Sequence, residues 1–211
     1  MSTNTDATVT GILERRVSAI IRTDDQQEAA QAMRAAVAGG FRLVEFTLTT
    51  PGAVELVTEF ARNPDLLVGA GTVLTRQQAR EAVRAGAKFL VSPVCDPEVI
   101  AEATALGVVC IPGTFTPTEM LAAHRAGAEF VKLFPAPSQR VAEFVAAVRG
   151  PMPFLRIFPT AGVSAENFLE VLDAGAAGVG FVKSLFVPAE LEARDFTAIE
   201  RRAADICQRL R

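Results

Sequence analysis

Hydrophobic positions along the chain gather in short, nearly continuous runs that are separated by longer stretches of mixed composition. Eight of these runs have the composition of β-strands, at residues 17–22, 41–48, 66–71, 88–93, 107–112, 129–134, 154–160 and 177–182. A strand that is apolar on both faces is typical of a parallel sheet covered by helices. Because a segment of helical composition follows each run, the pattern predicts eight β/α units.

The stretches between the runs carry residues that begin helices. A capping side chain stands directly before a proline, the favoured first helical residue, in Thr50-Pro51, Asp96-Pro97 and Thr116-Pro117. Residues 75–78 and 116–119 match the capping box, in which two side chains bond each other's backbone N–H groups. These signals predict helices after the second, third, fourth and fifth strands.

A weak internal repeat points to the same architecture. Helix ends with glycine read AVAGGF, RAGAKF, RAGAEF and DAGAAGVGF, and they precede the second, fourth, sixth and eighth strands. Glycine after a helix is ordinary capping chemistry, so the recurrence at every second strand is what carries the argument. We therefore predict one α/β domain over residues 1–211, a (β/α)8 TIM barrel with a short N-terminal helix, in preference to an open doubly wound sheet.

Composition and charge exclude several classes of partner. The chain has 21 Lys and Arg against 24 Asp and Glu, a net charge of −3, and no basic run, which disfavours a nucleic-acid partner. The N-terminus is polar, and no apolar run approaches the roughly 18 residues of a membrane span, so we expect neither a secretion signal nor a membrane partner. Three widely spaced cysteines suit a reducing cytoplasm.

The sixth apolar run, in EFVKLFPA, contains Lys132. The active site of a barrel of this kind lies at the C-terminal ends of its strands. If Val131 and Leu133 face the helices, Lys132 and Phe134 face the barrel interior, because side chains alternate along a strand. Desolvation lowers the pKa of a lysine, and the neutral amine can then attack a carbonyl and form a Schiff base.

Glu45, in LVEFTL, is embedded in the second run in the same way. Its carboxylate can move protons at a reacting centre next to Lys132. A buried Lys132–Glu45 ion pair is the structural alternative, but burying two charges usually costs more than their attraction returns. The pair therefore favours catalysis, with the iminium as electron sink and no metal or other cofactor.

The other candidate ligands and nucleophiles are poor. His124 is the only histidine and lies in a predicted helix, EMLAAHRAGAEF, so a histidine-based zinc site cannot be built, and a surface or partly buried position is expected. Cys95, near a strand end, is expected to be a packed thiol rather than a nucleophile.

The order and spacing of RLVEFTLTT, VGAGTVL, VSP, IPGTFTPTE, FVKLFPA and FPTAGVSAENF resemble the 2-keto-3-deoxy-6-phosphogluconate (KDPG) aldolase family. That family includes the 4-hydroxy-2-oxoglutarate and the 2-keto-3-deoxy-6-phosphogalactonate (KDPGal) aldolases. The resemblance extends from about Arg16 to Pro188. It implies a homotrimeric (β/α)8 fold and a Schiff-base aldolase that uses neither a metal nor a cofactor.

The resemblance also implies roles for individual residues. Lys132 matches the Schiff-base lysine of the family's F-x-K-x-F-P-A motif, and Glu45 matches its general acid/base. Thr72 matches the threonine that binds the pyruvate carboxylate, and Pro93 and Phe134 match residues that line the pocket.

The carboxylate end of the site departs from the family's pattern. Thr49, in EFTLTT, stands where the KDPG branch has an arginine that helps hold the substrate carboxylate. Arg22, at the end of AIIR, can supply that charge, as the matching arginine does in the KDPGal branch. The alternative for Arg22 is an exposed residue at the end of a strand.

The phosphate end departs as well. The turn after the seventh strand reads PTAG where the family often has PTGG, and it contributes three candidate substrate ligands, Thr160, Ala161 and Gly162. The helix after Ser164 is expected to offer free N–H groups to an anion. After the eighth strand, GVGFVKSLF replaces a Gly-Ser turn. Ser184 is a candidate phosphate ligand, and Lys183 either adds a positive charge there or points to solvent.

These features predict a class I aldolase, an aldehyde-lyase. Its substrate would be a phosphorylated 2-keto-3-deoxy sugar acid (KDPG or KDPGal) or 4-hydroxy-2-oxoglutarate, cleaved reversibly to pyruvate and glyceraldehyde 3-phosphate or glyoxylate. The alternative is a non-catalytic barrel that binds a phosphorylated metabolite or a protein partner. A phosphate-binding barrel isomerase would leave the buried lysine of EFVKLFPA unexplained.

Overall fold

The computed structural model describes residues 3–137 and 140–210. Parallel strands form two curled sheets, one of six strands in the order β5-β4-β3-β2-β1-β9 and one of three in the order β6-β7-β8. The strands are β1 (Val17–Ile21), β2 (Leu43–Thr47), β3 (Leu67–Gly71), β4 (Phe89–Val91), β5 (Val109–Ile111), β6 (Gly113–Thr114), β7 (Val131–Leu133), β8 (Ile157–Pro159) and β9 (Val179–Phe181).

The two sheets meet at two places. Only Pro112 separates β5 from β6 along the chain, and Thr160, directly after β8, forms an isolated bridge with Gly180 of β9. Each predicted apolar run contains a strand, but the ladder is shorter than the run, and β6 lies beyond the predicted fifth run. Phe41, for example, is completely buried although β2 begins at Leu43. Packing thus extends past the hydrogen-bonded ladder, so an apolar run overestimates strand length.

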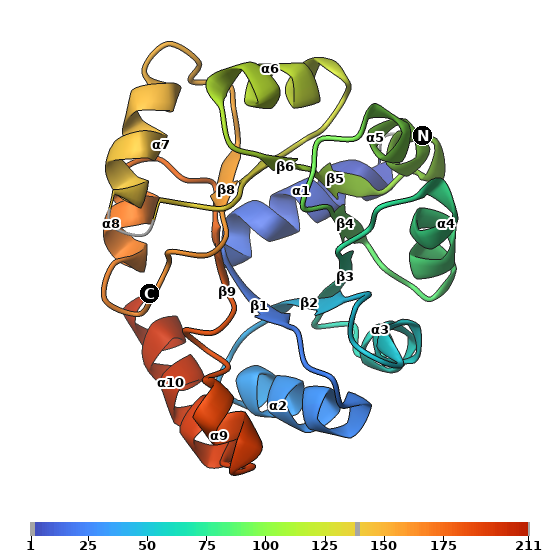
Figure 1. The fold of residues 1–211 in the computed structure, drawn as a ribbon, viewed down its shortest axis with the longest axis vertical. Helices are drawn as coiled ribbons and strands as arrows, with labels where there is room; N and C mark the ends of the chain where they lie inside the picture. The colour runs from blue at the N-terminus through green and yellow to red at the C-terminus, as the bar shows by residue number, and fades with distance from the viewer. Residues whose placement is uncertain (1–2, 138–139, 211) are drawn as a thin grey trace.

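Helices form an outer layer around the strands (Figure 1). This layer contains α2 (Gln26–Ala38), α3 (Ala53–Phe60), α4 (Arg76–Arg84), α5 (Pro97–Leu106), α6 (Pro117–Arg125), α7 (Val141–Arg149), α8 (Phe168–Asp173), α9 (Pro188–Glu192) and α10 (Phe196–Arg209), and the chain begins with a further helix, α1 (Thr3–Arg15). Among the described residues, no helix is both long enough and apolar enough to cross a membrane.

Most of the predicted helix starts are confirmed. Asp96 caps α5, and Thr116 and Glu119 form a complete capping box at α6. The capping box predicted at residues 75–78 is half formed, because the Gln78 side chain accepts the N–H of Leu74 rather than that of Thr75.

The helix start predicted at Thr50-Pro51 is wrong. Helix α3 begins at Ala53, behind Gly52 with φ +67°. The Thr50 hydroxyl instead accepts the backbone N–H of Thr23, which ties the segment after β1 to the segment after β2.

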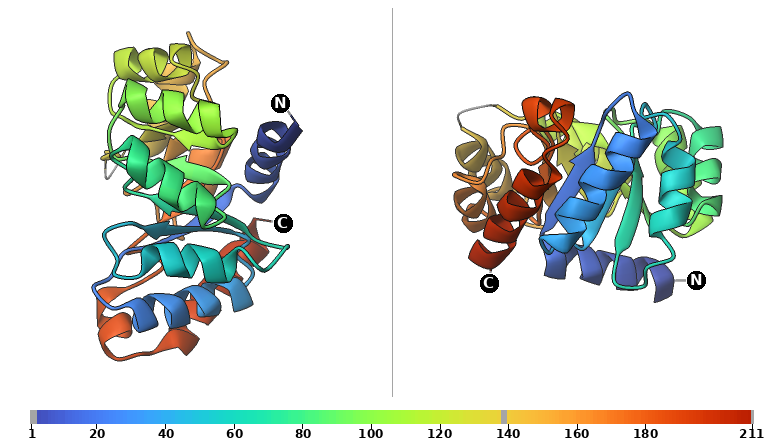
Figure 2. Two further views of the ribbon diagram at one scale, coloured as in Figure 1. Left: turned by 90° about the vertical axis from the view of Figure 1, so that its right-hand side faces the viewer. Right: turned by 90° about the horizontal axis from the view of Figure 1, so that it is seen from below.

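The N-terminal helix α1 lies apart from the outer layer, across one end of the strands (Figure 2). The Thr5 hydroxyl donates to the carbonyl of Gly107, two residues before β5, and Gly11 packs on Leu67, the first residue of β3. Ile12 belongs to an inner hydrophobic cluster with Leu43, Phe89, Val109 and Phe130. Helix α1 thus closes the N-terminal ends of the strands, and their C-terminal ends are left for a site.

Candidate active site

A cavity of about 330 Å³ opens at the C-terminal ends of the strands. Nine of the predicted site residues line it: Arg22, Glu45, Lys132, Phe134, Thr160, Ala161, Gly162, Lys183 and Ser184. Sequence reasoning missed four other lining residues: Ile20, Thr47, Val163 and Val182. The alternation of side chains was the available signal for Ile20 and Thr47, because they lie two residues from Arg22 and Glu45 on the same strand faces.

Lys132 lies on β7 with its side chain 7% exposed. Its neighbours Val131 and Leu133 pack into the main hydrophobic core, as the alternation predicts. The Lys132 amine lies 4.8 Å from the centre of the Phe134 ring, a distance at which an ammonium attracts the ring face. Burial lowers the pKa of Lys132, Glu45 acts in the opposite direction, and the positive charge of Arg22 lowers the pKa further.

Glu45 lies on β2, between the core residues Val44 and Phe46, and its side chain is 2% exposed. Burial raises the pKa of Glu45, and the positive charges of Lys132 and Arg22 work against that rise. Its carboxylate packs directly on the backbone of Gly71. A Cβ atom at Gly71 would lie 1.9 Å from Glu45 Oε1, which explains the second glycine of GAG.

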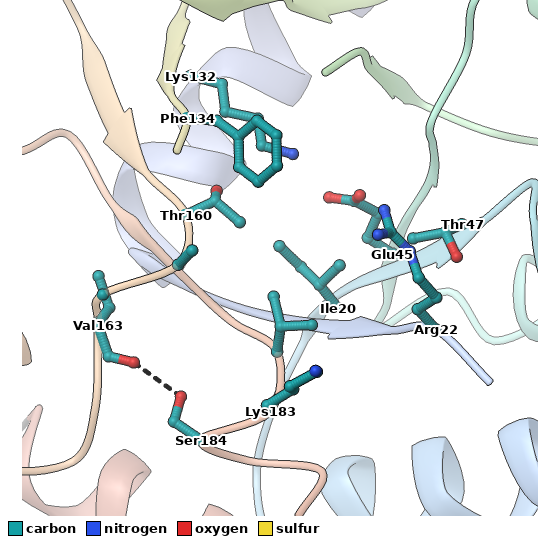
Figure 3. A pocket seen from close by; sticks show the side chains of 13 residues that line it. Ile20, Arg22, Glu45, Thr47, Lys132, Phe134, Thr160, Val163, Lys183 and Ser184 are labelled. Atoms are coloured by element: carbon teal, nitrogen blue, oxygen red, sulfur yellow. Dashed lines mark hydrogen bonds between the residues drawn. The ribbon is translucent and has the colours of Figure 1, made fainter. Parts of the chain in front are cut away.

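Lys132 and Glu45 point into the same space from different sides of the cavity (Figure 3). In the described part of the chain the two groups form neither a hydrogen bond nor a salt bridge, and their interaction is a longer-range electrostatic one. The structural alternative of a buried ion pair is therefore not what the chain forms. The amine and the carboxylate are both left available to a third molecule.

Arg22 follows β1, and its Nη2 donates to the Thr72 hydroxyl over 3.1 Å. Thr72 comes directly after Gly71, has φ 59°, and is not among the residues that line the cavity. Thr49 is exposed and lines a different surface hollow, and its hydroxyl lies 3.1 Å from that of Thr47. Arg22, rather than position 49, thus brings a guanidinium to the cavity.

The turn after β8 runs through two residues with positive φ, Ala161 at 72° and Gly162 at 67°. The expectation of a helix directly after Ser164 is wrong, so any N–H groups offered there are not those of a helix N-terminus. Helix α8 begins only at Phe168, and the N–H groups of Ser164 and Glu166 already donate to the side chains of Asn167 and Ser164. An anion at this end would depend on the turn itself and on nearby side chains.

Two residues after β9 close the other side of the cavity. The Ser184 hydroxyl donates to the carbonyl of Val163 over 2.7 Å, so it joins the turn after β9 to the turn after β8 (Figure 3). Lys183 is exposed, yet it lines this cavity and a neighbouring hollow that also includes Arg22. Lys183 therefore both brings a positive charge to the cavity and remains exposed to solvent, because its side chain lies at the mouth of the cavity.

The remaining predicted residues lie outside the cavity. Pro93 follows β4 and packs on Gly113, where a Cβ atom would lie 2.3 Å from its carbonyl carbon. His124 is exposed on α6, 5.0 Å from the Phe154 ring. Burial, with Glu119 and Asp96 nearby, raises the pKa of Cys95, which disfavours a thiolate. In residues 3–137 and 140–210, no group of three or more His, Cys, Asp or Glu side chains is placed to hold a metal ion.

Comparisons with known proteins agree on one family. The family model of KDPG and KHG aldolase matches residues 10–202. A 2-dehydro-3-deoxy-phosphogluconate aldolase of Treponema pallidum is 35% identical over 91% of this chain and 92% of its own length. A probable 2-dehydro-3-deoxy-6-phosphogalactonate aldolase of Rhizobium meliloti is 37% identical, over 83% of this chain and 84% of its own.

A solved structure adds a chemical observation. KDPG aldolase of Legionella pneumophila, with pyruvate captured as a covalent carbinolamine, superposes with a TM-score of 0.84. The two chains are 26% identical, and the match covers 94% of this chain and 97% of that one. A carbinolamine is the adduct that an amine forms with a ketone before water is lost.

Proposed function

The chain belongs to the family of KDPG and KHG aldolases, and from this premise we propose that its cavity forms a Schiff base between Lys132 and a 2-oxo acid. The protein is a class I aldolase, a lyase that cleaves a carbon–carbon bond to give pyruvate and an aldehyde. The observation that carries the proposed residue roles is the geometry of Lys132. Its amine is desolvated, faces a cavity large enough for a small sugar acid, and makes no salt bridge with the nearby Glu45.

The reaction begins with the neutral amine of Lys132. Because burial lowers its pKa, a larger share of the amine is unprotonated near neutral pH than on an exposed lysine. The amine adds to the C2 ketone to give a carbinolamine, which loses water and becomes a protonated imine. The imine nitrogen then accepts the electron pair of the C3–C4 bond, so cleavage leaves the enamine of pyruvate on Lys132.

Glu45 moves the protons. Its carboxylate takes the proton of the C4 hydroxyl as the C3–C4 bond breaks, directly or through a water molecule, and the carbonyl of the aldehyde forms. Protonation of the enamine at C3 and hydrolysis of the imine then release pyruvate and restore the amine of Lys132. A raised pKa brings Glu45 closer to neutrality, where a group that both accepts and donates a proton works best.

Recognition of the substrate's charged ends is a separate part of the proposal. The Arg22 guanidinium, held by Thr72, binds the carboxylate next to the reacting ketone. Lys183 and the turn of Thr160, Ala161 and Gly162 face the anionic group at the other end of the substrate, which we call the distal anion. Ser184 supports that turn through its hydrogen bond to the carbonyl of Val163. Pro93 supports the wall through Gly113. A distal phosphate or a distal carboxylate fits this set, so the substrate is KDPG, KDPGal or 4-hydroxy-2-oxoglutarate.

The assembly is proposed at three levels. One domain spans residues 1–211, and its two sheets join into a single (β/α)8 barrel. The contiguity of β5 and β6 and the bridge between Thr160 and Gly180 support that closure. A homotrimer is supported by three exposed apolar side chains on adjacent strand ends, Leu74, Val94 and Phe115. A cytoplasmic location is supported by the thiols of Cys95 and Cys110, which form no disulfide.

The test is to trap the adduct. The protein is incubated with pyruvate and borohydride, and intact mass and peptide mapping locate the reduced pyruvyl group. We expect one adduct on Lys132 and none in Lys132→Ala, whose circular dichroism should match the wild type. Lys88, an exposed lysine before β4, gives the matched control, since Lys88→Ala should retain the adduct. A folded wild type that forms no adduct would instead support a non-catalytic, metabolite-binding barrel.

A further inference from the structure

A second, much smaller cavity lies deeper in the molecule than the candidate active site. It offers about 10 Å³ of space and is lined mainly by apolar side chains of the inner cluster, such as Leu43, Phe89 and Phe158. Four polar residues also line it: Ser18, Glu45, Lys132 and Thr160. The last three line the larger cavity too, so the two spaces share the side chains of Glu45, Lys132 and Thr160.

Ser18 is the unusual member of this set. It lies on β1, between Val17 and Ala19 of the main core, and is 2% exposed. Its neighbours across the ladders are Leu43 on β2 and Gly180 on β9. The Ser18 hydroxyl is buried and has no hydrogen-bond partner among the described residues. Burying a hydroxyl without a hydrogen-bond partner costs free energy, so we expect the Ser18 hydroxyl to have a partner.

The small cavity matches the requirements of one water molecule. A buried water needs roughly 10–15 Å³ of probe-occupied space and two to four polar partners. The space here is at the lower end of that range, and four of the residues that line it, Ser18, Thr160, Glu45 and Lys132, carry a polar group on the side chain. Nothing larger than water fits.

We propose that Ser18 binds a single internal water molecule beneath Lys132 and Glu45, and that this water donates a hydrogen bond to the Glu45 carboxylate from the side away from the substrate. Ser18 is then a positioning residue, because it acts on the reaction only through the water and Glu45. The catalytic part of this inference rests on the proposed function, whereas the water site itself does not.

The consequence concerns the charge of Glu45. Burial raises the pKa of this carboxyl, and the charged side chains that face it are Lys132 from β7 and Arg22 after β1, with Lys183 at the mouth of the same cavity. A water that donates to the carboxylate stabilises its charged form and so lowers the pKa. Ser18 would therefore help keep Glu45 ionised and ready to accept the C4 hydroxyl proton.

The test combines a crystal structure with a pH profile. A high-resolution structure of the wild type should show one water within hydrogen-bond distance of Ser18 Oγ and Glu45, and Ser18→Ala should lose it. The acid limb of kcat/KM should move to higher pH by roughly 0.5–1 unit in Ser18→Ala, because the carboxylate loses a donor. Borohydride trapping on Lys132 should continue in both proteins.

Three further variants separate this effect from a general disturbance of packing. Ser92→Ala removes another buried hydroxyl, one that accepts the N–H of Val94 near the end of β4, and its acid limb should match the wild type. Ser18→Thr retains the hydroxyl. Ser18→Val places a side chain of the same shape as threonine there, but without the hydroxyl. The acid limb should move further in Ser18→Val than in Ser18→Thr.

The inference is overturned if the wild-type structure has no water at Ser18. It is also overturned if Ser18→Ala and Ser92→Ala shift the acid limb equally. A failure of the proposed function is distinct, because it would appear as a missing pyruvate adduct in the wild type whether or not the water is seen.

Discussion

Lys132 and Glu45 show how the site is built at the scale of single residues. Each lies in the middle of an apolar run whose neighbouring side chains belong to the core, and each is nearly inaccessible to solvent. Burial moves the two pKa values toward each other, downward for the amine and upward for the carboxyl. The same environment that costs folding free energy makes the amine nucleophilic and the carboxyl able to exchange protons.

The first prediction concerns the pH dependence of adduct formation. Because the pKa of Lys132 is below the usual 10.5, the neutral amine is populated at lower pH than on an exposed lysine. The initial rate of trapping with pyruvate, measured by mass spectrometry under borohydride, should rise with pH and level off below pH 10.5. A rate that keeps rising beyond that pH would mean that burial does not activate the amine.

The shift in Lys132 also has a consequence for stability. Between the pKa of the folded protein and 10.5, the unfolded chain binds more protons at this position than the folded chain. The contribution of Lys132 to stability should therefore increase as pH rises through that window. Glu45 acts in the other direction, since its raised pKa means that the folded chain binds more protons just above pH 4.5.

A second prediction at this scale concerns Gly71. A methyl group there would overlap Glu45 Oε1 and push the carboxylate away from its position. Gly71→Ala should lower kcat by about 10²-fold, the cost of misplacing a catalytic group by about an ångström. The Lys132 adduct should still form, because the lysine is not displaced.

Gly107→Ala is the matched control for Gly71→Ala. Gly107 has φ +69° and open space around its would-be Cβ, so the change should cost about 1–2 kcal/mol of stability and leave kcat unaltered. Steady-state kinetics and urea unfolding distinguish the two outcomes. Equal kcat in Gly71→Ala and the wild type would show that Glu45 tolerates displacement.

At the scale of elements, the strands position the two buried ionisable side chains, and the capping residues determine where the helices begin. Lys132 and Glu45 come from strands, whereas the residues that we propose for anion binding come from turns whose form depends on local backbone geometry. Ala161 occupies a conformation that favours glycine, with φ 72°, and α8 starts later than the sequence suggests. The proposed catalytic pair therefore lies on the more regular part of the cavity, and the residues proposed to bind the distal anion lie on the less regular part.

The prediction at this scale concerns the capping box of α6. Thr116 accepts the N–H of Glu119, and the Glu119 carboxylate accepts the N–H groups of Phe115 and Thr116. Thr116→Ala should lower the free energy of unfolding by about 1 kcal/mol at neutral pH, measured with urea. Thr58→Ala, on the exposed face of α3, is the control and should stay within about 0.5 kcal/mol of the wild type.

The effect should depend on acidity. The backbone N–H groups lower the pKa of Glu119, so its stabilising contribution is present above pH 4.5 and is lost as pH falls through its folded pKa. Thr116→Ala removes the part of this contribution that comes from the Thr116 hydroxyl, which also donates to the Glu119 carboxylate, so its difference from the wild type should shrink in acid. A difference that is constant with pH would show that the Thr116 hydroxyl does not stabilise the charged Glu119.

At the scale of the whole molecule, exposed apolar side chains gather on one part of the rim. Leu74, Val94 and Phe115 follow β3, β4 and β6, and they are 45%, 49% and 46% exposed. The strands before them are neighbours in the curled sheets, with β5 and β6 joined through Pro112. Exposed apolar side chains that follow neighbouring strands favour an interface at this part of the surface.

The corresponding prediction is about mass in solution. The wild type should behave as a trimer, three times the chain mass of 22.4 kDa, in light scattering after size exclusion. Val94→Asp combined with Phe115→Asp should give monomers, because burying carboxylates in an apolar interface is costly. Phe154→Asp changes an equally exposed phenylalanine outside this patch and should leave the trimer intact. A monomeric wild type would contradict the trimer.

The sequence by itself determined the eight apolar runs, most of the helix starts and the choice of Lys132 and Glu45 as the candidate catalytic pair. These follow from local rules, since alternation places Lys132 and Phe134 on one face and a buried charge inside an apolar run is conspicuous. It misplaced the starts of α3 and α8, because the Thr23 N–H donates to the Thr50 side chain and the Ser164 N–H donates to the Asn167 side chain, and these bonds compete with helix formation there.

Only the tertiary structure decided how distant residues meet. It turned Lys132 and Glu45 toward one cavity without a salt bridge, placed the Glu45 carboxylate on Gly71, joined Arg22 to Thr72, and buried the Ser18 hydroxyl without a hydrogen-bond partner among the described residues. Local pattern says which face a side chain takes, but the distance between two faces depends on how the strands curl and pack. That distance is what decides whether two buried charges neutralise each other or remain available for chemistry.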